Sequence, residues 1–276
     1  MAIYIVKPWY KKGGSVTVVP FSTGTDEEIA AMLDAYYANK LTWAEMGWAV
    51  GDTRLIHIDG AGSSSAQDIT AVILAHDHTK LATPINGHNN ACITVQFREV
   101  ANMLSYANGD SSYDMNFTKW ANLYLRTWLN GGILNRFTYS TGKGSGTSFK
   151  DMIKPSKHYR HTSYGTNTSE EVTDTLFLPS HAEIFGTSSS YSYYKPTSPT
   201  EGTQFAYFAT YTNRKKYNND NGSQGSTAKN WWTGSPSSNT QYQAYFGYAW
   251  LGVDTNSNQV EVYGHNYIDV VPTWAM

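Results

Sequence analysis

Hydrophobic residues fall in short runs along this chain, and stretches rich in Gly, Ser, Thr and Asn separate them. Runs of about four to eight apolar or β-branched residues with such boundaries are typical of strands. Residues 244–253 and 259–263 flank the polar sequence 254–258, which predicts an antiparallel hairpin. The pattern predicts further strands over residues 2–7, 15–21, 54–58, 68–74, 91–97, 175–179, 231–233 and 270–274.

Signals for helices are fewer. Thr25 and Ser180 are each followed three residues later by Glu, which forms the capping box that opens a helix. Thr42 is expected to cap a second short helix. Rings and leucines at helical spacing predict another helix over residues 120–128, ended by the Asn-Gly-Gly sequence at 130–132.

The remaining segments are less regular. Residues 149–153 predict a short helix or turn, and residues 205–209 are apolar enough to be ordered. The Ser/Tyr/Pro/Thr-rich segment 187–203 and the Asn/Gly/Ser-rich segment 217–229 predict loops. Together these elements indicate an α+β fold with irregular antiparallel strands, two or more helices and long loops.

The chain is expected to divide near residue 48. Residues 1–47 would form a hairpin-and-helix unit that is too small for a robust core of its own. We expect this unit to pack on a neighbour, a partner chain or the main domain, and to serve attachment or oligomerisation. Residues 48–276 would form the larger, ligand-binding domain.

Composition narrows the classes of function. Charged residues make up 15% of the 276 residues, against about 25% in average soluble domains. The net charge of −2 leaves no global electrostatic footprint for nucleic acid. No apolar run is long enough to span a membrane. Cys92 is the only cysteine, which excludes an intrachain disulfide, and the first residues lack the features of a secretory signal peptide.

Aromatic residues make up 14% of the chain and are concentrated at residues 241–267, where Asn, Gln and His alternate with them. Tyr and Trp give large contact areas at small entropic cost, and Asn and Gln give adaptable hydrogen bonds, as in antibody paratopes. The alternative is packing, because successive side chains of a strand point to opposite faces. The predicted ligand contacts are Tyr242, Tyr245, Tyr248, Trp250, Asn256, Asn258, Tyr263, His265, Asn266 and Tyr267. Tyr191, Tyr193 and Tyr194 would rim the same face or fold within their own loop.

Other candidate chemistry is sparse, and no catalytic residue is predicted. Hydrolase motifs such as Gly-x-Ser-x-Gly are missing. His76 and His78 would share one face of a strand, but no third ligand is placed by spacing, so no metal site is predicted. The basic cluster at 214–216 is expected to be a solvated face or an anion contact.

No cofactor is expected, although loop oxygens leave open a structural calcium ion. The candidate ligands for such an ion are Asp110, Asp114 and Asn116 in one loop, and Asn219, Asp220 and Asn221 in another.

Six segments, in order along the chain, resemble an uncharacterised domain family of Firmicutes and their phages. The matching stretches are residues 50–57, 66–69, 125–129, 176–186, 231–236 and 270–274. The resemblance implies a C-type-lectin-like fold, similar to that of formylglycine-generating enzymes. Two positions depart from the family, which usually has Arg where Gly234 and Val271 stand. Trp231, Trp232 and Trp274 lie inside family-like motifs and are expected to be scaffold.

The segment 1–45 resembles the leaders of phage-tail members of this family. Related C-type-lectin domains at phage tail tips, including those varied by diversity-generating retroelements, bind host receptors. The resemblance therefore implies a receptor-binding protein at the tail tip of a virion, or alternatively at a bacterial surface. Its partners would be a host surface protein or glycan, other tail or baseplate proteins, and its own copies in a trimer. Two alternatives remain: a carbohydrate-active or sulfatase-modifying enzyme, and a structural baseplate or decoration protein.

Overall fold

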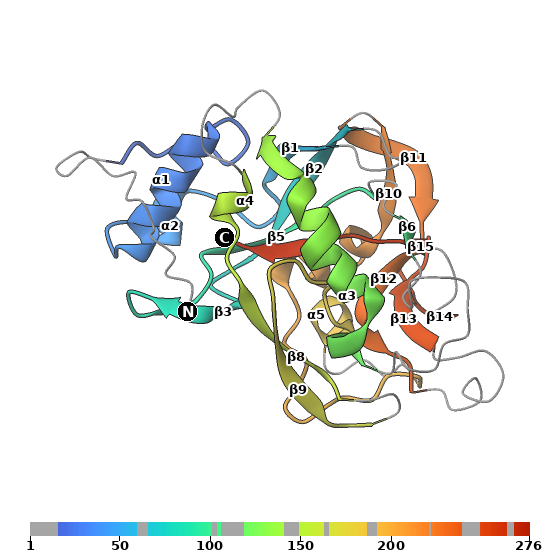
Figure 1. Ribbon diagram of the computed structural model, residues 1–276. Helices are drawn as coiled ribbons and strands as arrows, with labels where there is room; N and C mark the ends of the chain where they lie inside the picture. Colours follow the sequence, from blue (N-terminus) through green and yellow to red (C-terminus); the bar gives the residue numbers. More distant parts are fainter. Residues whose placement is uncertain are drawn as a thin grey trace.

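The protein has an α+β fold of mostly antiparallel sheets with short helices (Figure 1). The computed structural model describes residues 16–59, 66–100, 104–105, 119–140, 149–162, 166–186, 192–220, 222–238, 249–263 and 268–276. Of residues 104–105, 138–140, 249–250 and 263, it describes only the backbone.

The central sheet has the strand order β16-β5-β2-β1-β7. Most of β2 and all of β5 are buried, because the sheet is covered on both faces. The last strand, β16, pairs with β5 through Trp274 opposite Val95. The bounds are β1 Thr53–Ile58, β2 Gln67–His76, β5 Ile93–Phe97, β7 Phe137–Ser140 and β16 Thr273–Ala275.

Three further sheets surround this centre, with the orders β14-β13-β12-β15-β6, β4-β3-β8-β9 and β10-β11. Strand β12 pairs in parallel with β15 and antiparallel with β13. The bounds are β3 Lys80–Ile85, β4 His88–Asn90, β6 Leu104–Ser105, β8 Ser156–His161, β9 Ser169–Asp174, β10 Lys216–Asp220, β11 Ser223–Lys229, β12 Trp231–Pro236, β13 Ala249–Val253, β14 Gln259–Tyr263 and β15 Ile268–Asp269. The predicted strands at 54–58, 68–74, 91–97 and 231–233 and the predicted hairpin around 254–258 are confirmed.

The helices are short except for the first, and three of them begin where a cap was predicted. Thr25, Thr42 and Ser180 each accept a hydrogen bond from the backbone N–H three residues on, and the Glu at that position accepts one in return. The bounds are α1 Asp26–Tyr37, α2 Trp43–Met46, α3 Tyr124–Thr127, α4 Phe149–Met152, α5 His181–Phe185, and, as 3₁₀ or π turns, η1 Trp120–Asn122, η2 Trp128–Ile133, η3 Leu134–Arg136, η4 Ala206–Ala209 and η5 Tyr211–Arg214.

The helix predicted over 120–128 is broken into η1, α3 and η2, and the Asn-Gly-Gly sequence does not end it. The Asn130 side chain instead joins this segment to the chain beyond β9. Its Oδ1 accepts the backbone N–H groups of Thr175 and Leu176, and its Nδ2 donates to the Leu176 carbonyl. The backbone continues through Asn130 as a π-helical turn, Trp128–Ile133.

Three other predictions of secondary structure were wrong. Residues 217–229, predicted as a loop, form the hairpin β10-β11, where the Asn219 amide bonds the Asp68 carbonyl and the Gly222 N–H. These tertiary contacts override a polar composition that disfavours strands. Residues 175–179 are not a strand and make one bridge, between Phe177 and Thr273. Residues 16–20 form no strand, and the predicted strand 2–7 lies outside the described residues.

The described part of the predicted N-terminal unit packs on the rest of the chain. The Tyr37 hydroxyl donates to the Met276 carbonyl at 3.0 Å and accepts from the Cys92 N–H at 3.1 Å. Arg54 of β1 and Asp26 of α1 form a fully buried ion pair at 2.7 Å. Helix α1 therefore shares one hydrophobic core with the central sheet, beside the C-terminal strand (Figure 1).

The core is aromatic where β16 meets the central sheet. Trp274 is fully buried and packs edge-on against Phe97 and Phe137, with ring centroids 5.1 and 5.2 Å away. Trp231 and Trp232 are also fully buried, which confirms that the three tryptophans in family-like motifs are scaffold.

Candidate functional site

A surface hollow of about 420 Å³ lies where α5, η5 and the turn between β13 and β14 come together. Its lining mixes rings, amides, hydroxyls and one cation. The lining residues are Phe185, Ser192, Tyr211, Arg214, Ser257, Asn258 and Gln259. This volume falls in the range of small-molecule sites, about 300–1,000 Å³.

One wall of the hollow is the turn that joins β13 to β14. Asp254 fixes this turn, because its Oδ1 accepts the backbone N–H groups of Asn256 and Asn258, both at 2.8 Å. Ser257 has a φ of +69°, a left-handed conformation that the closed turn requires. The backbone carrying the two predicted contacts Asn256 and Asn258 is therefore held in a single arrangement.

The opposite wall is η5, which presents Tyr211 and Arg214. The Tyr211 hydroxyl lies 2.6 Å from the Asn256 carbonyl and 2.7 Å from the Asn258 Oδ1, and its one proton donates to one of them at a time. The Arg214 guanidinium lies over the rings of Phe185 and Tyr211, 5.0 and 5.6 Å from their centroids. Its Nε donates to the Phe208 carbonyl at 3.0 Å. Two segments far apart in sequence thus meet across the hollow.

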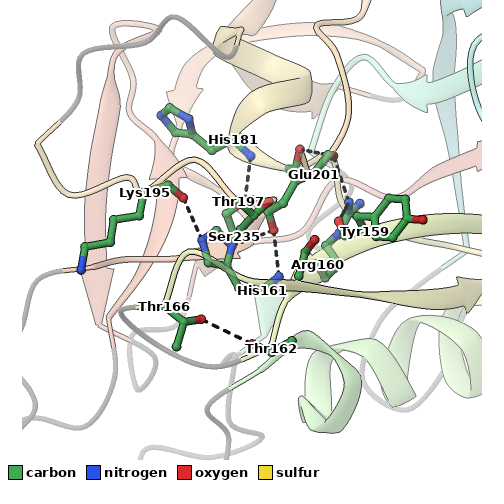
Figure 2. Close-up of polar contacts among 12 residues, drawn as sticks. Tyr159, Arg160, His161, Thr162, Thr166, His181, Lys195, Thr197, Glu201 and Ser235 are labelled. Carbon is green, nitrogen blue, oxygen red and sulfur yellow. Dashed lines mark hydrogen bonds and ion pairs between the residues drawn. The ribbon is translucent and has the colours of Figure 1, made fainter. Parts of the chain in front are cut away.

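The floor of the hollow rests on a buried polar network (Figure 2). The Gln259 Oε1 lies 2.9 Å from the Nε2 of His181. The His181 backbone N–H donates to the Ser235 hydroxyl, which donates to Glu201 at 2.6 Å. Glu201 in turn lies 2.9 Å from the Nδ1 of His161. The network therefore connects β8, α5, β12 and the loop that carries Glu201.

Charges in this network are balanced in two pairs. Burial opposes the charge on His161, but the neighbouring Glu201 carboxylate outweighs burial and raises the pKa of His161. Burial likewise opposes the charge on Glu183, but the Arg160 guanidinium, His158 and the Ser180 N–H together outweigh burial and lower the pKa of Glu183 to about 2. Pairing therefore favours the charged forms of His161 and Glu183 and holds the floor in one geometry.

Gly234 lies against this network, at one of the positions where the resembled family usually has Arg. A Cβ there would approach the Leu178 carbonyl oxygen to 2.7 Å and the Arg160 Nε to 3.0 Å. The buried Arg160 side chain occupies the neighbouring space, so residue 234 has no room for a side chain in this structure.

His181 makes the network sensitive to acid. Burial lowers the pKa of His181 to about 4, whereas histidine in an unfolded chain titrates near pH ~6.5. Between these values the unfolded chain binds a proton that the folded chain does not, so acidification reduces stability. The expected loss from this residue is about 3 kcal/mol between pH 6.5 and 4.

The measurement is urea denaturation of the wild type and of His181→Gln at pH 7, 5.5 and 4.5. His158, whose pKa burial also lowers, acts in the same direction, and His161 acts in the opposite one. Both remain in the variant, so the difference between the two proteins isolates His181. The variant should lose less stability on acidification; an identical pH dependence would contradict the buried neutral imidazole.

A second hollow, of about 260 Å³, borders the same network between β3, β8 and the loop at 199–203. Beneath it lies a serine–histidine–glutamate arrangement that resembles a hydrolase triad, formed by Ser156, His158 and Glu183. The Ser156 Oγ lies 2.8 Å from the His158 Nε2. The Glu183 carboxylate lies 4.0 Å from the His158 Nδ1 and is bonded to Arg160. Ser156 is 0% exposed, so no substrate reaches its hydroxyl in this conformation. The arrangement works as internal hydrogen bonding, and no sequence motif indicated it.

The structure assembles only part of the predicted ligand-binding set. Asn258 lines the first hollow, and the Asn256 carbonyl holds Tyr211. The backbone of Trp250 in β13 pairs with Val262 in β14, and that of Tyr263 in β14 pairs with Ala249 in β13. Their side chains are not described, and Tyr242, Tyr245, Tyr248, His265, Asn266 and Tyr267 lie outside the described residues.

Sequence reasoning missed the wall formed by Tyr211 and Phe185. The basic cluster 214–216 contains Arg214, which lines the hollow, but the predicted solvated face is wrong for Lys216. Lys216 is fully buried, donates to the Phe97 carbonyl at 2.8 Å and lies beside the Trp231 ring. Burial lowers the pKa of Lys216 to about 7.

The loop tyrosines divide between surface and interior. Tyr193 is exposed, whereas Tyr194 is buried and stacks on the His181 ring with centroids 4.0 Å apart. Tyr191 lies outside the described residues. Tyr194 therefore belongs to the packing beneath the first hollow.

No metal site forms from the candidates within the described ranges. Asp77 has a φ of +44°, so the chain turns between His76 and His78. His76 stacks on Trp43 and His78 bonds Thr203 instead. No group of three His, Cys, Asp or Glu side chains meets at one point there. The Asn219 amide is used within the β10-β11 turn, while Asn221 and the loop holding Asp110, Asp114 and Asn116 are outside the described residues.

Fold and site together define an α+β protein with a preorganised surface hollow that mixes rings, amides and one cation. The chain belongs to the family of the domain of unknown function DUF6273, whose model matches residues 93–266. That span includes both walls and the floor of the first hollow. No curated protein and no solved structure matches the chain. Within the described ranges, no helix is both long and apolar enough to cross a membrane.

Proposed function

We propose that this protein is a binding module that recognises a host cell-surface ligand through the first hollow and the aromatic segment that follows β12. The observation that carries the proposal is the hollow itself. Exposed Tyr211, the Asn258 amide and the Arg214 guanidinium converge there on a floor fixed by buried ion pairs. Groups preorganised in this way bind a ligand without first being ordered, which favours affinity.

The sequence resemblance supports the further parts of the proposal. It supports a C-type-lectin-like fold, a place at the tail tip of a phage virion, and assembly as a trimer. Exposed Val18, Trp43 and Val50 on and beside the N-terminal unit fit a surface that attaches to other tail proteins. A role in catalysis is a weaker candidate, because the serine, histidine and glutamate beneath the second hollow are engaged with one another and buried.

The test compares two tyrosine variants with similar exposure. Tyr211→Ala removes a wall of the hollow, where the side chain is 48% exposed, and Tyr124→Ala removes a ring on α3 that is 42% exposed. Fluorescently tagged protein is applied to a panel of Firmicutes cells and adsorption is measured by flow cytometry. We expect the wild type and Tyr124→Ala to adsorb equally to at least one strain.

Tyr211→Ala should bind about thirtyfold or more weakly, since central aromatic contacts contribute about 2 kcal/mol or more. The melting temperature of both variants should stay close to that of the wild type, because neither ring belongs to the core. Adsorption by Tyr211→Ala equal to that of Tyr124→Ala, or no adsorption of the wild type to any strain, would refute the proposed function.

A further inference from the structure

Within the described residues, Arg214 lacks the carboxylate partner that four of the other five arginines have; Arg136 also lacks one and donates to the Asp59 carbonyl instead. Arg54, Arg98, Arg126 and Arg160 each form an ion pair with a carboxylate. Arg214 forms none within the described part of the chain. Its guanidinium is nevertheless partly withdrawn from water, which makes a missing counter-charge costly.

The guanidinium is also held in place. Its Nε is engaged with the Phe208 carbonyl, and the rings of Phe185 and Tyr211 lie 5.0 and 5.6 Å from its centre. These contacts fix the plane of the side chain but use only one of its three nitrogens. The two terminal nitrogens keep the planar fork that pairs with a carboxylate or phosphate through two parallel hydrogen bonds.

The rest of the hollow suits a ligand rich in hydroxyl groups. Tyr211 offers an exposed ring for the C–H face of a sugar, and Asn258 and Ser192 offer an amide and a hydroxyl. A mixture of rings and small polar groups binds polar ligands at small entropic cost. A simple anion would leave these groups without a role.

We propose that the hollow binds an anionic saccharide, with the acidic group on Arg214, the ring on Tyr211 and the hydroxyls on Asn258 and Ser192. This inference rests on the proposed function and specifies its ligand class. The acidic group is a uronate carboxylate or a sugar phosphate, because both fit the guanidinium fork.

The experiment titrates the full-length protein, by calorimetry, with four probes. Methyl β-D-glucuronide and glucose 6-phosphate carry the two anions, methyl β-D-glucoside is the neutral match, and inorganic phosphate is the anion without a sugar. We expect at least one acidic sugar to bind about tenfold or more tightly than the neutral glucoside, which corresponds to one charge-assisted pair. Which acidic sugar binds more tightly distinguishes carboxylate from phosphate.

Arg214→Gln should abolish the preference for the acidic sugar, and Arg214→Lys should retain part of it, because lysine keeps the charge and loses the fork. Lys215→Gln is the matched control. Lys215 follows Arg214 in sequence, but its ammonium group lies over the Tyr217 ring and the residue does not line the hollow. This control should leave the preference unchanged. If Arg214→Gln unfolds, the comparison of Arg214→Lys with Lys215→Gln still decides the role of the fork.

Equal binding of charged and neutral sugars, or a preference that survives both Arg214 variants, would overturn the inference. Inorganic phosphate that binds as tightly as the sugars would also overturn it, because the ligand would then be a bare anion. These outcomes are separate from the proposed function. Cell adsorption that depends on Tyr211 while no acidic sugar is preferred would retain the binding module and reject this ligand class.

Discussion

Replacing Arg54 with methionine is expected to lower the free energy of unfolding by about 3–5 kcal/mol. Arg54 and Asp26 are fully buried, and the guanidinium donates to Asp26 and to the carbonyls of Phe21 and Gly24 at 2.7–2.8 Å. Methionine fills most of the same volume but removes the counter-ion of a buried carboxylate and the guanidinium donors of two carbonyls. The loss therefore comes from desolvated polar groups and not from a cavity.

The matched variant is the double substitution Asp26→Asn with Arg54→Met. It removes the unpaired charge as well as its partner, so it should recover part of the lost stability. Urea denaturation of the wild type, the single variant and the double variant gives the three free energies. A loss below about 1 kcal/mol in Arg54→Met would show that the pair behaves as a solvated surface ion pair.

The second large effect is expected for Glu201→Ala, which should cost about 3–5 kcal/mol near pH 6. Glu201 is buried and lies within 2.6 to 3.2 Å of the Ser235 hydroxyl, the His161 ring and the His161 backbone N–H. The alanine leaves His161 buried without its counter-ion. Burial then dominates, and the pKa of His161 should fall below its ordinary value.

The sign of the pH dependence follows from the raised pKa of His161 in the wild type. Its pairing with Glu201 contributes stability that is fully present below the unfolded pKa and is lost as pH rises through the folded pKa. Glu201→Ala should therefore lose most at pH 6 and less at pH 8. NMR titration of the His161 ring measures the pKa directly, and Ser235→Ala, which removes one neutral hydrogen bond, should cost only about 1 kcal/mol. An unchanged His161 titration in Glu201→Ala would contradict this account.

Local signals in the sequence predicted local structure well. The three capped helix starts and the hairpin around Asp254 depend on residues within a few positions of one another. Their hydrogen bonds could therefore be predicted from the spacing of residues in the sequence. The β10-β11 hairpin was missed because its turn is held by Asn219 contacts to β2, far away in sequence. The helical turn that continues through Asn130 likewise involves long-range contacts, from the Asn130 side chain to Thr175 and Leu176.

In the candidate site, too, residues held by local contacts could be predicted and residues held by long-range contacts could not. Asn256 and Asn258 could be predicted because their turn is local. Tyr211 and Arg214 could not be placed beside them, because η5 reaches that turn only through the packing of Phe208 and Trp231 in the core. The His161–Glu201 pair brings together residues from a strand and a loop, and no spacing rule relates them.

The place of β16 in the central sheet has a kinetic consequence. Residues 273–275 complete a sheet whose other strands come from residues 53–140, and Trp274 closes the aromatic core between them. Joining segments so far apart requires closing a long loop, which slows folding. Until those residues leave the ribosome, the edge of β5 and the rings of Phe97 and Phe137 lack their partners. During synthesis, the chain therefore passes through a stage with an open strand edge that can pair with other molecules.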